Sequence, residues 1–132
     1  MGLFRLQAPQ PIITMDFFPT FLAAAGIEPP KGRKLDGVNL VPFLTGKKAP
    51  FERTLFWRYK RLTNVRKAVR DGDMKYVWEN GKEELHNLAG DEGEKRNLLP
   101  EHEAEARKLR AKLAAWEKEV EAPRLKNFPR KA

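Results

Sequence analysis

The sequence predicts an α+β fold in which about four mostly antiparallel strands form a sheet, a long C-terminal helix packs on it, and an N-terminal helix precedes it. Two turn signals and one helical pattern support this fold. The dipeptides Asp71-Gly72 and Asn80-Gly81 favour hairpin turns, because these residue types adopt positive φ at little steric cost. The segments beside these turns alternate apolar and polar residues, and a helical stripe follows them.

The segment around the two turns predicts three short strands and then an acidic loop that leads to the last helix. Met74, Tyr76 and Trp78 would share one face of a strand, whereas Lys75 and Val77 would share the other. Since the first of these faces is strongly apolar, we expect another element to cover it.

The last helix is the expected cover. It is predicted to begin near Pro100 and to stop at Pro123, and its apolar residues recur at spacings of three and four. These residues are Ala106, Leu109, Leu113, Trp116 and Val120. Burial of one such side chain stabilises a fold by ~1.5–3 kcal/mol, far more than a surface ion pair does. We therefore expect packing, rather than charge, to hold this helix against the sheet.

The N-terminal part of the chain predicts further elements. Residues 16–25 combine a wide apolar face with strong helix formers, and Gly26 suits the C-terminal cap. Residues 39–45 predict a second, shorter helical turn, and residues 54–60 have the composition of a strand. Residues 61–65 would connect that strand to the meander.

The length allows one domain at most. We expect an irregular lead-in over residues 1–11, a single folded domain over residues 12–122, and a basic flexible tail over residues 123–132. Ile12 and Ile13 are compatible with a short strand at the start of the domain.

The composition excludes several kinds of site. Lys and Arg number 26 against 18 for Asp and Glu, and the net charge of +8 favours polyanionic partners. Neither Cys nor Ser is present, so disulfides, thiolate metal sites and the two commonest nucleophiles are excluded. No apolar run approaches the ~20 residues that a membrane span needs, and residues 1–10 lack a signal-peptide pattern, so we expect no membrane association.

Residues 47–70 contain nine cations, one acid (Glu52) and interspersed aromatic residues. Cations beside stacking aromatics suit a surface for single-stranded nucleic acid. On a strand, however, alternation would place Trp57 and Tyr59 on one side and Arg58 on the other. We therefore favour a core face with a solvated charged face, and keep a small polyanion- or nucleic-acid-binding module as the alternative function.

No catalytic or metal-binding constellation is visible. Asp71 and Asp73 are spaced as in a calcium loop, but the residues that follow lack the further oxygen ligands. His86 and His102 are far apart and have no partner at ligand spacing. The acids within residues 83–94 lie in a polar segment that gives no sign of desolvation. We predict a turn for the two aspartates and a strand face for His86.

Five segments resemble, in order and spacing, the C-terminal portion of the sulfatase family, the arylsulfatase-like hydrolases of the alkaline-phosphatase superfold. They are MDFFPTFLAAAGI (15–27), LDGVNLVPFLTG (35–46), LFWRY (55–59), AVRDGDMKYV (68–77) and ELHNLAGDEGEKRNL (84–98). Each segment is weak alone, but together they cover about residues 12–121. Family members often have Tyr-Asp in place of His86-Asn87 and Asp-Pro in place of Asp91-Glu92.

The resemblance implies a small C-terminal subdomain with a four-stranded antiparallel sheet and a terminal helix. It also implies that the whole enzyme hydrolyses sulfate esters, using a calcium ion and a formylglycine made from Cys or Ser, both in a larger N-terminal domain. This chain has neither Cys nor Ser, so it cannot hold the nucleophile. The resemblance places the metal ligands in segments upstream of Ile12, so no catalytic residue or metal ligand is assigned to this chain, and we expect it to be inactive alone. Its partner would be that N-terminal catalytic domain.

In some family members the C-terminal sheet borders the substrate cleft. The resemblance therefore makes Trp57, Arg58 and Tyr59 candidates for contact with a sulfated or other anionic substrate, since Arg forms forked hydrogen bonds to such anions. A purely structural adaptor without a ligand is a third possibility.

The resemblance also bears on the surface. The helix over residues 16–25 would normally lean on the N-terminal domain, so we expect an exposed apolar patch around Phe17, Phe18 and Phe21. Family members are often periplasmic or secreted, but the sequence leaves the compartment, the substrate and the oligomeric state open.

Overall fold

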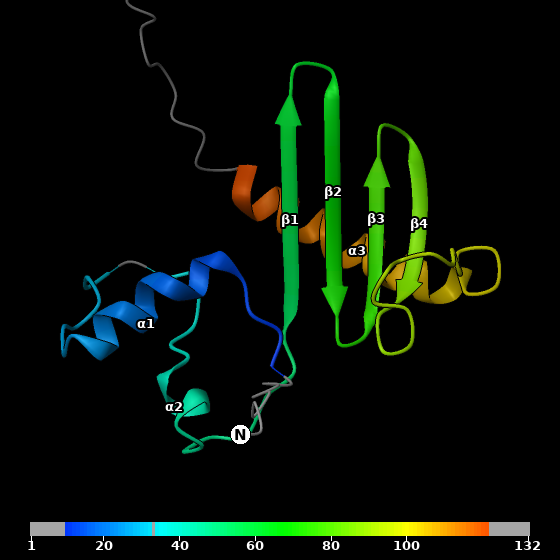
Figure 1. The fold of residues 1–132 in the computed structure, drawn as a ribbon. Coiled ribbons are helices and arrows are strands. Elements are labelled where there is room, and N and C mark those ends of the chain that lie inside the picture. Colours follow the sequence, from blue (N-terminus) through cyan, green and yellow to red (C-terminus); the bar gives the residue numbers. More distant parts are fainter. Residues whose placement is uncertain (1–9, 33, 122–132) are drawn as a thin grey trace, which may run out of the picture. The chain divides into compact units, whose positions relative to one another are not determined.

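The computed structural model describes residues 10–32 and 34–121, except for the side chain of Glu121. The chain divides into two compact units at residues 52 and 53 (Figure 1), and each unit is described by itself. The predicted tail, residues 123–132, and most of the predicted lead-in, residues 1–11, lie outside the described residues. The single domain over residues 12–122 stays a prediction.

The N-terminal unit is built around two helices, α1 (Phe17–Ala24) and α2 (Val41–Leu44), with a 3₁₀ turn (Thr14–Asp16) before α1. Both predicted helices are confirmed. After α1 the chain reverses at Gly26, whose φ of 69° is the left-handed value expected of a cap. The predicted short strand at residues 12 and 13 is wrong, because these residues adopt no strand.

Asp16 holds the two halves of this unit together. Its side chain is fully buried, and its two carboxylate oxygens accept hydrogen bonds from the backbone N–H groups of Ile13 and Val38, each at 2.9 Å. The Thr20 hydroxyl accepts a further bond from the backbone N–H of Leu40 at 3.0 Å. A buried carboxylate is tolerated only with such donors, so these bonds fix where residues 38–40 cross the start of α1.

The C-terminal unit contains a four-stranded sheet in the order β1-β2-β3-β4, and every neighbouring pair is antiparallel (Figure 1). The strands are β1 (Thr54–Arg61), β2 (Asn64–Asp71), β3 (Met74–Glu79) and β4 (Lys82–Asn87). The predicted number, order and orientation of the strands are confirmed. The predicted connection over residues 61–65 is too long, because only Leu62 and Thr63 lie outside the two strands.

The predicted helix is α3 (Glu103–Glu121), which crosses one face of the sheet (Figure 1). The core consists of three sheet residues and three helix residues, each at most 4% exposed. They are Val69, Tyr76, Leu85, Ala106, Leu109 and Leu113. Trp116 packs at the edge of this core and stacks on Phe56 with a ring separation of 5.2 Å. The predicted apolar stripe therefore does cover the face that carries Tyr76.

The acidic loop after β4 is tied back to that strand. The Asp91 carboxylate accepts hydrogen bonds from the backbone N–H groups of Arg96 at 2.8 Å and Lys95 at 3.1 Å, and these donors lower its pKa. The backbone N–H of Leu98 donates to the carbonyl of Leu85 at 2.7 Å. These bonds lead the chain from β4 to α3, so the loop has a structural role.

Candidate functional site

The sheet has one face covered by α3 and a second face, here called the open face, which α3 does not cover. Because side chains alternate along a strand, β1 sends Leu55, Trp57 and Tyr59 to the open face and Phe56 and Arg58 toward α3. The sequence-based candidates are therefore divided between the two faces.

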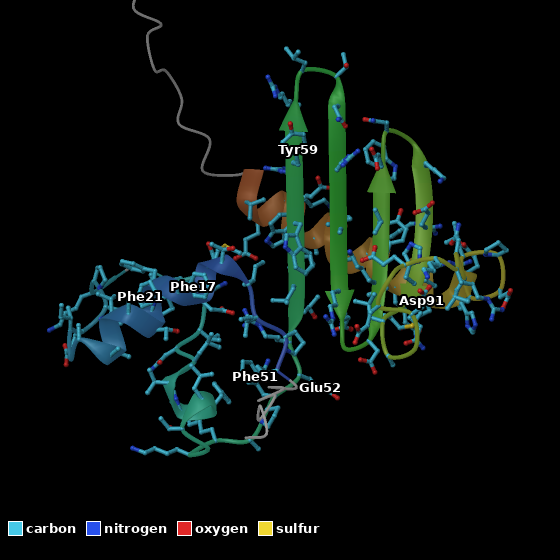
Figure 2. The ribbon with its side chains drawn as sticks, viewed as in Figure 1. Phe17, Phe21, Phe51, Glu52, Tyr59 and Asp91 are labelled. Carbon is cyan, nitrogen blue, oxygen red and sulfur yellow. The ribbon has the colours of Figure 1, made fainter. Side chains whose placement is uncertain are left out.

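Two of the three candidates lie together on the open face. Trp57 is 37% exposed and Tyr59 is 49% exposed. Tyr59 lies near the end of β1 where the chain turns into β2 (Figure 2). Arg58 lies on the opposite face, where its guanidinium carbon is 5.9 Å from the centre of the Trp116 ring. One of its nitrogens is 3.9 Å from a carboxylate oxygen of Glu117. The packing of α3 therefore accounts for the position of Arg58.

The open face carries three arginines on β1 and β2. Strand register places Arg66 opposite Tyr59 and Arg70 opposite Leu55, and Arg61 follows Tyr59 on the same face of β1. A terminal nitrogen of Arg66 is 2.5 Å from a carboxylate oxygen of Glu79, and Nε of Arg70 donates to the carbonyl of Gly72 at 2.9 Å. Residues 53–70 include no Asp or Glu. Sequence reasoning counted these arginines but did not identify their face.

The other half of the open face, on β3 and β4, is of mixed charge. Lys75 pairs with Glu94 at 2.5 Å. His86 is 2% exposed and lies on β4 as predicted; its Nδ1 is 3.0 Å from the carbonyl oxygen of Arg96, and its Nε2 is 3.5 Å from Glu84. The pKa of Glu84 is lowered, chiefly by the hydrogen bond from Lys82. These contacts tie the loop after β4 to the sheet.

A second candidate surface, here called the α1 patch, lies in the N-terminal unit. Phe17, Phe18 and Phe21 are 45%, 53% and 67% exposed, and the rings of Phe17 and Phe21 stack at 5.9 Å (Figure 2). Ile12 and Met15 are also exposed. Asp16 is the only charged residue among residues 11–27, and it is buried. The expected exposed apolar patch is confirmed.

The residues present do not fit the formylglycine and calcium that the family resemblance implies. The sequence contains no Cys or Ser from which formylglycine could be made. Among the described residues, no three or more His, Cys, Asp or Glu side chains are placed to hold a metal ion. In the same part of the chain, no helix is long and apolar enough to cross a bilayer.

Sequence comparison identifies the relatives of this chain. A sulfatase of Formosa agariphila is 31% identical over 131 residues, an alignment that covers 84% of this chain and 24% of the relative. The uncharacterized sulfatase YdeN of Escherichia coli is 60% identical over 37 residues, which are 28% of this chain and 7% of the relative. The chain is a sulfatase relative. No family model matches the sequence.

Comparison with solved structures supports the same relationship. The crystal structure of Ps i-CgsB matches with a TM-score of 0.71 and 24% identity over 81% of this chain and 24% of that chain, which shows a shared fold. A 2-O GAG sulfatase matches with a TM-score of 0.63 and 27% identity over 81% of this chain and 25% of that chain. This chain therefore corresponds to a portion of a sulfatase, about a quarter of the length of these proteins.

Proposed function

We propose that this chain forms the C-terminal part of a sulfatase, packs against a larger catalytic part and does not catalyse hydrolysis alone. The α1 patch is the observation that carries the proposal. A helix with no charged residue on any side is typical of the interior of a larger protein, because a surface helix presents a polar face to water. The Phe side chains of α1 remain about half exposed or more in this chain. A further protein part that covers them would remove this apolar surface from water.

The relatives support the proposal of a larger part. The chain matches only 24% of the Formosa agariphila sulfatase, so three quarters of that protein has no counterpart here. Sulfate ester hydrolysis through formylglycine requires a Cys or Ser precursor, and this sequence has neither. In this proposal the nucleophile and the metal ligands belong to the larger part. This chain contributes its sheet and α3 as a scaffold.

The sheet has a second proposed role, at the border of the substrate cleft. Trp57 and Tyr59 expose aromatic rings on one face of an edge strand, which suits contact with a sugar ring. Arg58 is less suited to contact the same ligand, because it faces α3. We keep Trp57 and Tyr59 as substrate contacts, with a sulfated or other anionic sugar as the substrate class.

The packing proposal can be tested by comparing one substitution in two contexts. In the isolated chain, Phe21→Asp should change the free energy of unfolding by less than about 0.5 kcal/mol, because the side chain is already 67% exposed. The second context is a chimera in which residues 12–121 replace the matching segment of the Formosa agariphila sulfatase. There the same substitution should cost about 3 kcal/mol or more, because the ring is buried and an Asp would lose its water.

Leu62→Asp is the matched control, since Leu62 is an exposed apolar residue outside the α1 patch. It should change the free energy of unfolding by the same amount in the two contexts. A folded chimera in which Phe21→Asp costs no more than it does in the isolated chain would contradict the proposed packing.

The alternative function, a basic module for nucleic acid or another polyanion, draws on the arginines of the open face. Most other cations of the sheet are already paired. Lys67 bonds to Glu117 at 2.9 Å, and Lys75 pairs with Glu94 at 2.5 Å. Non-specific nucleic acid binding depends on several cations that contact phosphates together, so this pairing weakens the alternative.

A further inference from the structure

The two halves of the open face differ in chemistry. The half on β1 and β2 carries Trp57, Tyr59, Arg61, Arg66 and Arg70, here called the arginine–aromatic strip. No acidic side chain of β1 or β2 lies on this face, because their only acid, Asp71, alternates to the side of α3 and bonds to Thr54 at 2.7 Å. The half on β3 and β4 is of mixed charge, because Lys75 pairs with Glu94 and Lys82 pairs with Glu84. An anionic ligand is therefore favoured over the strip.

The spacing of the strip suits a ligand with both rings and charges. Side chains two residues apart on a strand stand about 7 Å from one another, so Trp57 and Tyr59 form a short aromatic row. Directly opposed residues have Cβ atoms about 5 Å apart, which places Arg66 beside Tyr59. Arg70 lies opposite Leu55 and therefore diagonally across from Trp57. Each aromatic ring thus has a guanidinium group within reach.

The arginines are held in ways that leave donors for a ligand. Arg66 is oriented by Glu79, and Arg70 donates its Nε–H to the carbonyl of Gly72. A guanidinium group has five N–H donors in a planar fork, so one such bond leaves the others available to an anion. Sulfate oxygens, like phosphate oxygens, accept forked hydrogen bonds from this group.

We infer that the arginine–aromatic strip binds a sulfated saccharide, with Trp57 and Tyr59 against the sugar rings and Arg66 and Arg70 at the sulfate groups. The inference rests on the proposed function for its ligand class. It replaces Arg58 with two arginines of β2 as the anion-binding residues. The strip is short, and Glu79 already offsets the charge of Arg66. Such a strip suits a ligand with one or two sulfate groups better than a long chain of phosphates.

The test measures binding by the full chain with isothermal titration calorimetry. The probes are a sulfated dextran oligosaccharide, the same oligosaccharide without sulfate, and a single-stranded DNA oligonucleotide. The sulfated probe should bind most tightly. Arg66→Gln, Arg70→Gln and Trp57→Ala should each weaken its binding by about fivefold or more. Lys60→Gln removes the same charge from β1 but on the side of α3, and it should weaken binding by less than about twofold.

Several outcomes would overturn the inference. These are equal binding of DNA and the sulfated probe, equal losses in Lys60→Gln and Arg66→Gln, or no binding by a chain whose circular dichroism shows it to be folded. If the isolated chain aggregates, the same variants are compared in the chimera. The chimera distinguishes the two proposals. Absence of strip binding in a chimera where Phe21→Asp is strongly destabilising would contradict this inference alone. Strip binding in a chimera where Phe21→Asp costs no more than in the isolated chain would contradict only the packing proposal.

Discussion

The strongest quantitative prediction concerns Leu109, at the centre of the contact between α3 and the sheet. This side chain is 1% exposed and lies in the cluster that contains Val69, Tyr76 and Leu85. Leu109→Ala removes buried carbon atoms and leaves a cavity, which costs about 3 kcal/mol in cores of this kind. For a unit of this size, that loss lowers the melting temperature by about 12–24 °C.

The assay is urea unfolding followed by far-ultraviolet circular dichroism, with the free energy extrapolated to water. Leu62→Ala is the matched control, because it deletes the same atoms from a side chain that is 91% exposed. The control should change the free energy of unfolding by less than about 0.5 kcal/mol. If the two variants lose the same stability, α3 does not pack on the sheet as described.

Three further predictions concern backbone and charge. Leu62 has a φ of 53°, so Leu62→Asn should raise the free energy of unfolding by about 0.5–1 kcal/mol, measured by urea unfolding. The pKa of Asp91 is lowered in the folded chain, so its stabilising effect is complete above its ordinary pKa of about 4 and is lost as the pH falls through the lower folded value. Asp91→Asn should therefore flatten the loss of melting temperature between about pH 5 and pH 2, and an unchanged slope would count against it. A Cβ on Gly37 would clash with the backbone of Met15, so Gly37→Ala should lower the stability of the N-terminal unit, whereas Gly90→Ala, with open space around it, should have little effect.

The sheet and its cover could be predicted because short-range patterns determine them. Asn80 and Gly81 have φ values of 48° and 94°, as their dipeptide predicts for a hairpin turn. The alternation around Tyr76 and the spacing of Leu109 and Leu113 both indicate one apolar face, and these faces meet in the structure.

The turn at Leu62 and Thr63 could not be predicted in the same way. Neither residue favours positive φ, so the sequence gives no signal for a two-residue loop there, and the strands were expected to end earlier. The register of β1 against β2 depends on the length of this turn, so it could not be predicted either. The two-residue turn pairs Arg61 with Asn64 and therefore Tyr59 with Arg66.

In the candidate site, too, short-range patterns could be predicted from the sequence, whereas contacts between strands could not. Alternation alone separates Trp57 and Tyr59 from Arg58, and the structure confirms that separation. The arginines of β2 needed the register, which depends on contacts between distant residues. The exposure of α1 was expected from the resemblance, because this helix would normally lean on the N-terminal domain. The described residues do leave Phe17, Phe18 and Phe21 exposed.

The central proposal is that this chain forms the C-terminal part of a sulfatase and depends on a larger part for catalysis. Hydrolysis of para-nitrophenyl sulfate tests it most directly, with the purified chain alone and with the chimera that carries residues 12–121 in the Formosa agariphila sulfatase. The account predicts no turnover above background by the chain alone and, in the chimera, a kcat/KM within about tenfold of the parent enzyme. Turnover by the chain alone, or a folded chimera without activity, would contradict it.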